Sequence, residues 1–176
     1  MADRLKGEVS DMNIYGRTAV SEYLDDFVAY RNLVPLDRRL PPLAELRPPV
    51  GLPEGAIPRK TTPEYARVVV HILRRARELE APGTPIERLV YLGDTRMNDG
   101  TAFVNLCRAG GWSGLAFIAA EKNEPARVEV VEREQGATLY LTNRWAMLED
   151  FDRFCRERGW PVDERTAVIV DLDKTA

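Results

Sequence analysis

Four aspartates follow two of the apolar runs in this sequence, at the points where polar residues begin. Asp171 and Asp173 come after one run, and Asp94 and Asp99 come after the other. Because side chains alternate along an extended chain, carboxylates two residues apart point the same way. If the two runs are parallel strands, their carboxyl ends meet at the edge of the sheet where functional groups of open α/β sheets gather. We therefore expect these four carboxylates to face one small volume.

Such a group of carboxylates favours metal-assisted phosphoryl chemistry. Like charges this close repel one another unless some are protonated or a cation lies among them. Mg²⁺ suits such a place because it takes oxygen ligands and keeps waters or phosphate oxygens in its shell. A carboxylate beside the ion can attack phosphorus, since the metal reduces the repulsion between the two anions. A second acid nearby can protonate the leaving oxygen and then activate water.

Short apolar runs alternate with amphipathic stretches around these aspartates. Residues 62–64, Thr-Pro-Glu, are a strong helix start, and apolar side chains then recur at helical spacing over residues 65–79. Strands are expected at 89–92, 115–120, 128–131, 138–141 and 166–170, and further helices at about 101–108 and after a capping Asn143. The β-branched run at 166–170 is of the kind found at the centre of a parallel sheet. This alternation predicts an α/β fold, a Rossmann-like, largely parallel sheet flanked by helices.

The chain divides into three stretches by composition. Residues 1–34 are expected to form an N-terminal arm with one amphipathic helix, which starts at Thr18 and stops near Asn32. Residues 35–62 are expected to be an extended connector, because eight of the 12 prolines lie between Pro35 and Pro63. Residues 63–176 form the expected α/β domain.

Composition excludes several classes of protein. The 176 residues are 44% hydrophobic and 30% charged, which excludes a disordered or fibrous chain. The 25 Lys and Arg against 28 Asp and Glu leave a net charge of −3, which offers no global attraction to nucleic acid or an anionic membrane. The first six residues lack the apolar core of a signal peptide, and the two cysteines have no CxxC spacing. From composition we expect a cytoplasmic protein with neither nucleic acid nor membrane as a partner. The phosphoryl chemistry that the carboxylates favour suggests a small phosphorylated substrate.

Four motifs of this chain resemble those of the haloacid dehalogenase-like (HAD) hydrolases. An apolar strand followed by Asp-x-Asp-x-Thr, here residues 171–175, looks like the nucleophile motif of that family. Gly-Asp with a further Asp five residues on, here residues 93–99, is similar to its acidic metal-binding motif. Lys60 matches its phosphate-neutralising lysine, and the Thr-Asn pair at 142–143 is similar to the motif whose hydroxyl binds a phosphoryl oxygen. The match covers about residues 57–176, and its two aspartate motifs are the more specific ones.

The resemblance implies a HAD-like fold and a Mg²⁺-dependent phosphohydrolase that works through an aspartyl-phosphate. Asp171 would be the nucleophile and Asp173 the acid and base. Lys60 and Thr142 would bind the phosphate. The residues associated with the metal would be Asp94, Asp99, Asp171 and Asp173.

The order of the motifs along the chain differs from that of the family. The family runs nucleophile, threonine, lysine and acidic motif, whereas this chain runs Lys60, acidic motif, Thr142 and nucleophile motif, with one residue after Thr175. We expect either a rearranged order or a chain that is part of a longer unit, which a homo-oligomer or a complementing chain could complete. The alternative function is a non-catalytic HAD-like fragment or interaction module, which docks a partner through residues 35–63 and an exposed sheet edge.

Several of these residues also have plainer interpretations. Residues 98–100, Asn-Asp-Gly, could turn a β-hairpin in which the strand at 89–92 folds back onto 101–106. The Gly-Gly pair at 110–111 favours a helix end instead. Lys60 could be a surface lysine, and Thr142 could serve a turn or a helix cap.

Overall fold

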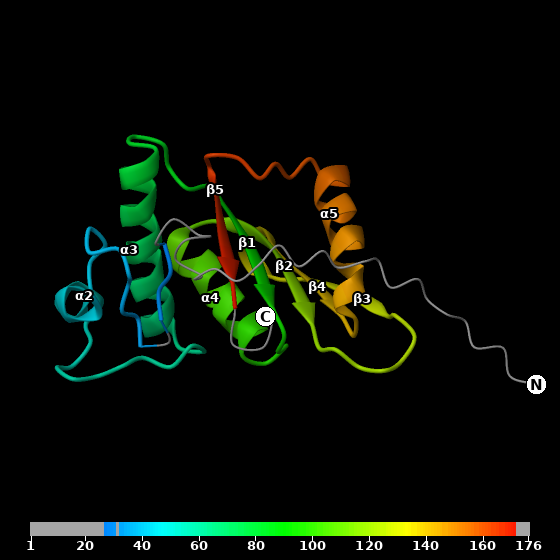
Figure 1. Cartoon of the computed structure of the whole chain (residues 1–176), viewed down its shortest axis with the longest axis horizontal. Coiled ribbons are helices and arrows are strands. Elements are labelled where there is room, and N and C mark those ends of the chain that lie inside the picture. The colour runs from blue at the N-terminus through cyan, green and yellow to red at the C-terminus, as the bar shows by residue number, and fades with distance from the viewer. Residues whose placement is uncertain (1–26, 31, 172–176) are drawn as a thin grey trace, which may run out of the picture.

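The computed structural model describes residues 27–30 and 32–171 of the chain, and its centre is a five-stranded sheet. The strand order is β3–β4–β2–β1–β5 (Figure 1). The strands are β1 (Arg88–Gly93), β2 (Ser113–Ala119), β3 (Val128–Glu132), β4 (Ala137–Thr142) and β5 (Thr166–Val170). All neighbouring pairs are parallel except β3 with β4. The predicted α/β fold with a largely parallel sheet is confirmed, and it is compatible with a Rossmann-like arrangement.

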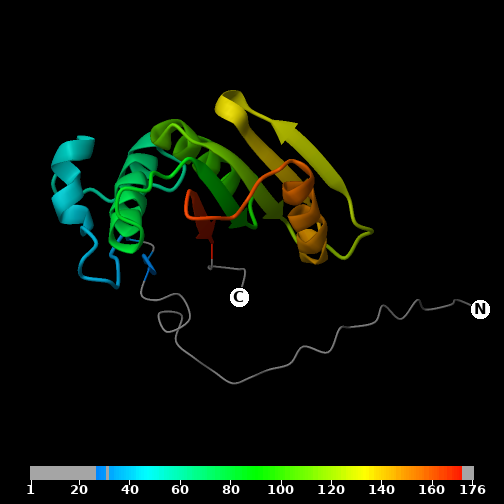
Figure 2. The ribbon, with the colours of Figure 1, turned by 90° about the horizontal axis from the view of Figure 1, so that it is seen from above.

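Helices cover both faces of this sheet (Figure 2). The helices are α2 (Leu43–Val50), α3 (Pro63–Glu80), α4 (Asp99–Gly110) and α5 (Leu148–Glu157), with short 3₁₀ turns η1 (Glu134–Gly136) and η2 (Trp145–Met147). Helices α3 and α4 pack on one face, α5 packs on the other, and α2 packs against the outer side of α3. No helix in the described ranges has the length and apolar character to cross a bilayer.

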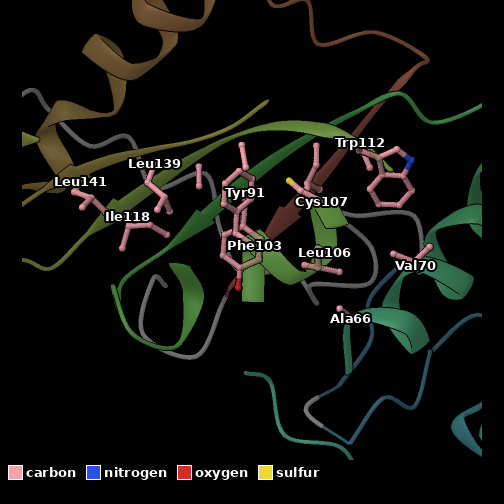
Figure 3. Packing of buried hydrophobic residues seen from close by; sticks show 14 residues of the cluster. Ala66, Val70, Tyr91, Phe103, Leu106, Cys107, Trp112, Ile118, Leu139 and Leu141 are labelled. Atoms are coloured by element: carbon pink, nitrogen blue, oxygen red, sulfur yellow. The ribbon is translucent and has the colours of Figure 1, made fainter. Parts of the chain in front are cut away.

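The core follows from the alternation of side chains along the strands. On one face Leu89 and Tyr91 of β1 meet Phe103 and Leu106 of α4, and Figure 3 shows Tyr91 and Phe103 together in this cluster. On the other face, Phe117 of β2 and its neighbours pack against α5. Both faces of the central strands are therefore apolar, which explains why the sequences of these strands are continuous apolar runs.

The start of α3 and the end of α4 lie where local signals place them. Thr62 Oγ1 accepts a hydrogen bond from the Tyr65 N–H at 3.4 Å, so the predicted cap of α3 is confirmed. Gly111 ends α4 with a left-handed φ of 71°, a conformation that glycine adopts without a steric penalty. Residues 101–106 are helical in α4, so the hairpin alternative is wrong.

Two expectations for the first third of the chain need correction. The connector at 35–62 is not extended throughout, because α2 forms within it and includes Pro48 and Pro49 in its last turn. Its buried residues Leu43, Leu46 and Val50 pack against α3, and this apolar contact outweighs the missing donors of the prolines. The N-terminal helix does not reach Asn32, because residues 27–30 and 32–34 are not helical. The remainder of that predicted arm, residues 1–26, lies outside the described residues.

Two expectations for the last third also differ from the structure. Asn143 does not cap α5. Its side chain accepts from the Arg127 N–H at 2.7 Å and donates to the Pro125 carbonyl, so it fastens the loop before β3 instead. β5 does not lie at the centre of the described sheet but at its edge, with β1 as its neighbour.

Candidate functional site

Three carboxylates that are distant in the sequence meet beyond the carboxyl ends of β1 and β5. Asp94, Asp99 and Asp171 each offer an oxygen within 4.8 Å of the others. β1 and β5 are parallel neighbours, and the Asp171 N–H donates to the Leu92 carbonyl at 2.9 Å. This ladder bond sets Asp171 beside the loop that follows β1. The expected meeting of these three aspartates is confirmed.

Lys60 provides the positive charge among these carboxylates. Its ammonium donates to Asp171 Oδ2 at 2.7 Å and forms a second, short ion pair with Asp99 Oδ1. Burial would lower the pKa of Lys60, but the hydrogen bonds and charges of the two aspartates outweigh burial and raise it. Asn105 of α4 donates to the Thr61 carbonyl at 3.0 Å, which fixes the segment that carries Lys60. Lys60 is thus a constituent of the cluster and not a plain surface lysine.

Asp99 is the most enclosed of the three carboxylates, with 1% of its side chain exposed. Its Oδ2 accepts from the N–H groups of Asp94 and Thr95 at 3.0 and 2.7 Å, and its Oδ1 accepts from the Tyr91 hydroxyl at 3.1 Å and from Lys60. Burial alone would raise the pKa of Asp99, but the Lys60 ammonium and the two backbone donors lower it. Asp99 is therefore ionised, and each of its oxygens already has two donors.

Gly93 is required by the close approach of the Asp99 side chain. A Cβ built at Gly93 would lie 2.7 Å from both Cβ and Cγ of Asp99, which is closer than real Cβ contacts. Only a residue without a side chain allows the first turn of α4 to fold back over the end of β1. The Gly-Asp pair of the acidic motif thus has a steric reason in this structure.

The Tyr91 ring lies beneath the cluster. The ring is buried, and the Lys60 ammonium lies 5.8 Å from its centroid, within range of a cation–π contact. Burial and the neighbouring Asp99 charge raise the pKa of Tyr91, so its hydroxyl stays protonated and donates to Asp99. The ring closes the site on the side of the core.

The donor set fits a hard divalent cation. Mg²⁺ takes oxygen ligands in octahedral geometry, and this cluster offers carboxylate oxygens from three elements. Asp99 is less suited to direct coordination because four donors already occupy its oxygens. Asp94 and Asp171 are better placed to contact an ion, since the described contact of the Asp94 carboxylate is one hydrogen bond to Oδ1, from the Thr95 hydroxyl at 2.7 Å. In this arrangement Asp99 orients Lys60 and the loop after β1.

Of the residues predicted for the site, Thr142 is not brought to it, and Asp173 lies outside the described residues. Thr142 ends β4, and β2 and β1 separate that strand from β5. Three strand spacings of about 4.8 Å amount to about 14 Å. The Thr142 hydroxyl accepts from the Arg144 N–H at 3.3 Å, in keeping with the plainer turn interpretation. Asp173 lies outside the described residues, so its place in the cluster remains a prediction.

The sequence did not point to Tyr91, Thr95 or Asn105. Tyr91 is one apolar residue in a buried strand, and its hydroxyl becomes functional only because α4 places Asp99 above it. Thr95 holds Asp99 through its backbone N–H, which any residue but proline offers. Asn105 lies 44 residues from its partner, and no local pattern marks that contact.

Comparison of the chain with protein-family models, with curated proteins and with solved structures finds no match. The functional argument therefore depends on the geometry of the cluster and on the motifs that the chain itself carries.

Proposed function

We propose that this chain is a Mg²⁺-dependent phosphohydrolase of the HAD type in which Asp171 is the nucleophile. The observation that carries the proposal is the meeting of Asp94, Asp99 and Asp171 around the Lys60 ammonium. Three motifs with a resemblance to one family, from separate parts of the chain, thus contribute to one cluster. A solvated group of unrelated acids would not need a shared lysine, a glycine for close approach and a buried tyrosine donor.

The residues of the cluster have distinct tasks in the proposed reaction. Lys60 attracts the phosphate dianion and holds one Asp171 oxygen in place. The Asp171 side chain is 24% exposed, so a phosphate can reach it. Bound Mg²⁺, held by Asp94 and Asp171 with Asp99 behind them, would supply the charge that reduces repulsion between carboxylate and phosphate.

The proposed chemistry has two steps. In the first, an Asp171 oxygen forms a bond to phosphorus while the bond from phosphorus to the leaving oxygen breaks, and that oxygen takes a proton from the acid. In the second, water attacks the phosphorus and gives a proton to the same residue as the bond to Asp171 breaks. The products are an alcohol, inorganic phosphate and the restored carboxylate. The resemblance assigns the acid and base to Asp173.

Hydrolysis of p-nitrophenyl phosphate tests this proposal. We expect turnover with Mg²⁺, none with excess EDTA, and a loss of about three orders of magnitude or more in Asp171→Asn. Asp152→Asn is a matched control, because Asp152 is an exposed aspartate on α5 that pairs with Arg156. Activity of Asp171→Asn equal to that of the control would overturn the proposal. A folded protein without Mg²⁺-dependent turnover would also overturn it and would favour the interaction module.

A further inference from the structure

Three apolar side chains are exposed around the candidate site, on three different segments of the chain. Met97 lies in the loop after β1, Ile57 precedes α3, and Val170 is the last residue of β5. Their exposed fractions are 74%, 57% and 41%, and Met97 is the most exposed of the large hydrophobic residues that the structure describes. Single exposed apolar residues are ordinary on a protein surface, but these three occur where the segments of one site meet.

Each of the three residues lies close in the chain to a member of the cluster. Val170 directly precedes the proposed nucleophile, Met97 comes two residues before Asp99, and Ile57 comes three residues before Lys60. An extended chain advances at most about 3.6 Å per residue, so each Cα atom lies within about 11 Å of the Cα of its neighbour in the cluster. Figure 1 shows the arrowheads of β1 and β5 at the same end of the molecule as the start of α3. We call Ile57, Met97 and Val170 the apolar rim of the site.

The contacts of the loop after β1 explain why Met97 is exposed there. Two backbone N–H groups of this loop donate to Asp99 Oδ2 at 3.0 and 2.7 Å, so the loop is fastened to the cluster. The Arg96 guanidinium pairs with Glu129 of β3 at 3.0 and 3.3 Å, and β3 lies at the opposite edge of the sheet from β5. The charged side chain before Met97 is therefore engaged away from Asp171. Met97 itself is long, flexible and polarizable, and such a side chain adapts to apolar ligands of different shape.

We propose that the apolar rim binds the leaving group of the substrate, so that the substrates are phosphate monoesters of apolar alcohols. This inference rests on the proposed phosphohydrolase function. Lys60 would attract the charged phosphate, and the leaving group would extend outward from Asp171 across the rim. An apolar group in that place removes apolar surface of both partners from water. A sugar there would give up hydrogen bonds to water without gaining replacements from these side chains.

The apolar surface extends far enough to favour a longer leaving group. Val168 lies two residues before Val170 on the same face of β5 and is 47% exposed, so the surface continues for about 7 Å along the strand. Full burial of one methylene group strengthens binding by about fourfold. A chain that contacts the rim on one side only gains about half of that free energy, or about twofold for each methylene. Four additional methylenes should therefore strengthen binding by more than about tenfold.

Alkyl phosphates of different length test this inference. We compare kcat/KM with Mg²⁺ for ethyl phosphate and hexyl phosphate, because both leaving groups are primary alcohols of similar acidity. The value for hexyl phosphate should be at least tenfold the higher. Turnover of p-nitrophenyl phosphate without a preference between the two alkyl esters would overturn this inference and leave the proposed function intact. No Mg²⁺-dependent turnover of any of the three esters would overturn both.

Substitution of Met97 tests the part that the rim has in this preference. Met97→Gln keeps the length of the side chain and makes its end polar, so kcat/KM should fall at least fivefold for hexyl phosphate and stay within about twofold for ethyl phosphate. The matched control is Val162→Gln, because Val162 is 67% exposed but precedes β5 at the other end of the strand, and it should change neither value.

Inhibition provides a measurement of binding without the chemical step. Hexylphosphonate, which cannot be hydrolysed, should inhibit turnover of p-nitrophenyl phosphate at least tenfold more strongly than ethylphosphonate. Met97→Gln should reduce that difference, and Val162→Gln should preserve it. If Met97→Gln keeps the full difference between the two phosphonates, the apolar rim does not bind the leaving group.

Discussion

Replacement of Lys60 by methionine removes the charge at the centre of the candidate site and keeps the length of the side chain. The substitution leaves Asp99 and Asp171 without their shared cation. The Asp99 carboxylate is destabilised more than that of Asp171, because its side chain is enclosed and water cannot replace the lost donor. We expect the free energy of unfolding to fall at neutral pH.

The size of the loss follows from burial and the remaining donors. Removal of one partner from a fully buried ion pair costs about 3–5 kcal/mol. Lys60 is 29% exposed, and Asp99 keeps its bonds from the Tyr91 hydroxyl and two backbone N–H groups, so the loss is smaller. We expect about 2–3 kcal/mol at pH 7. Lys122→Met is the matched control, since Lys122 is an exposed lysine and its substitution should stay within about 0.5 kcal/mol.

The pH dependence has a definite sign. The pKa of Asp99 is lowered in the folded chain, so its contribution to stability is present above the ordinary aspartate pKa and is lost as pH falls through the folded value. The pKa of Lys60 is raised, so its contribution is present below the ordinary lysine pKa and is lost as pH rises through the folded value. The deficit of Lys60→Met should therefore be largest between about pH 5 and 9 and should shrink below about pH 4.

Urea unfolding of the wild type, Lys60→Met, Asp99→Asn and the double variant measures these values. The loss in free energy of unfolding of the double variant should be smaller than the sum of the two single losses, by about 1 kcal/mol or more. If Lys60→Met lies within about 0.5 kcal/mol of the wild type at pH 7, the electrostatic reasoning is refuted.

Other substitutions test separate parts of the site. Gly93→Ala should lower both stability and phosphatase activity, because its Cβ would push Asp99 away, and thermal unfolding and turnover measure the two losses. Tyr91→Phe should cost about 1–2 kcal/mol in urea unfolding, because it removes one donor to an ionised, enclosed carboxylate. Asp94→Asn should weaken Mg²⁺ binding in calorimetry at least severalfold and leave the thermal unfolding midpoint almost unchanged, since an amide oxygen can still accept the described hydrogen bond from the Thr95 hydroxyl. Cys155, with its pKa raised to about 11 by burial, should react with a thiol reagent at pH 8 only after denaturant is added.

The sheet and its helices could be predicted because local signals and tertiary packing agree there. Strands buried on both faces are continuous apolar runs, and the caps at Thr62 and Gly111 are short-range features. The sequence does not predict α2, because its two prolines oppose a helix locally, whereas contacts with α3 favour it. Asn143 looks like a helix cap from its neighbours in the sequence, but its hydrogen-bond partners lie 16 and 18 residues away in the chain.

The candidate site was predictable as a set of charges but not as a geometry. Strand ends indicated where Asp94 and Asp171 would meet, since parallel neighbours share an edge. The sequence could not show that Asp99 is enclosed with four donors, because this depends on how α4 folds back over Gly93. The edge position of β5 also could not be predicted from the sequence, because a β-branched run indicates burial and not the order of strands in a sheet.

Chemical trapping of the phosphoryl group tests the central claim most directly. The full-length protein is mixed with Mg²⁺ and p-nitrophenyl phosphate, quenched, and reduced with borohydride, which converts an aspartyl-phosphate to homoserine. The account predicts homoserine at position 171 and at no other aspartate, with none formed when EDTA replaces Mg²⁺. Mg²⁺-dependent turnover with an unmodified Asp171, or homoserine at another position, would contradict it.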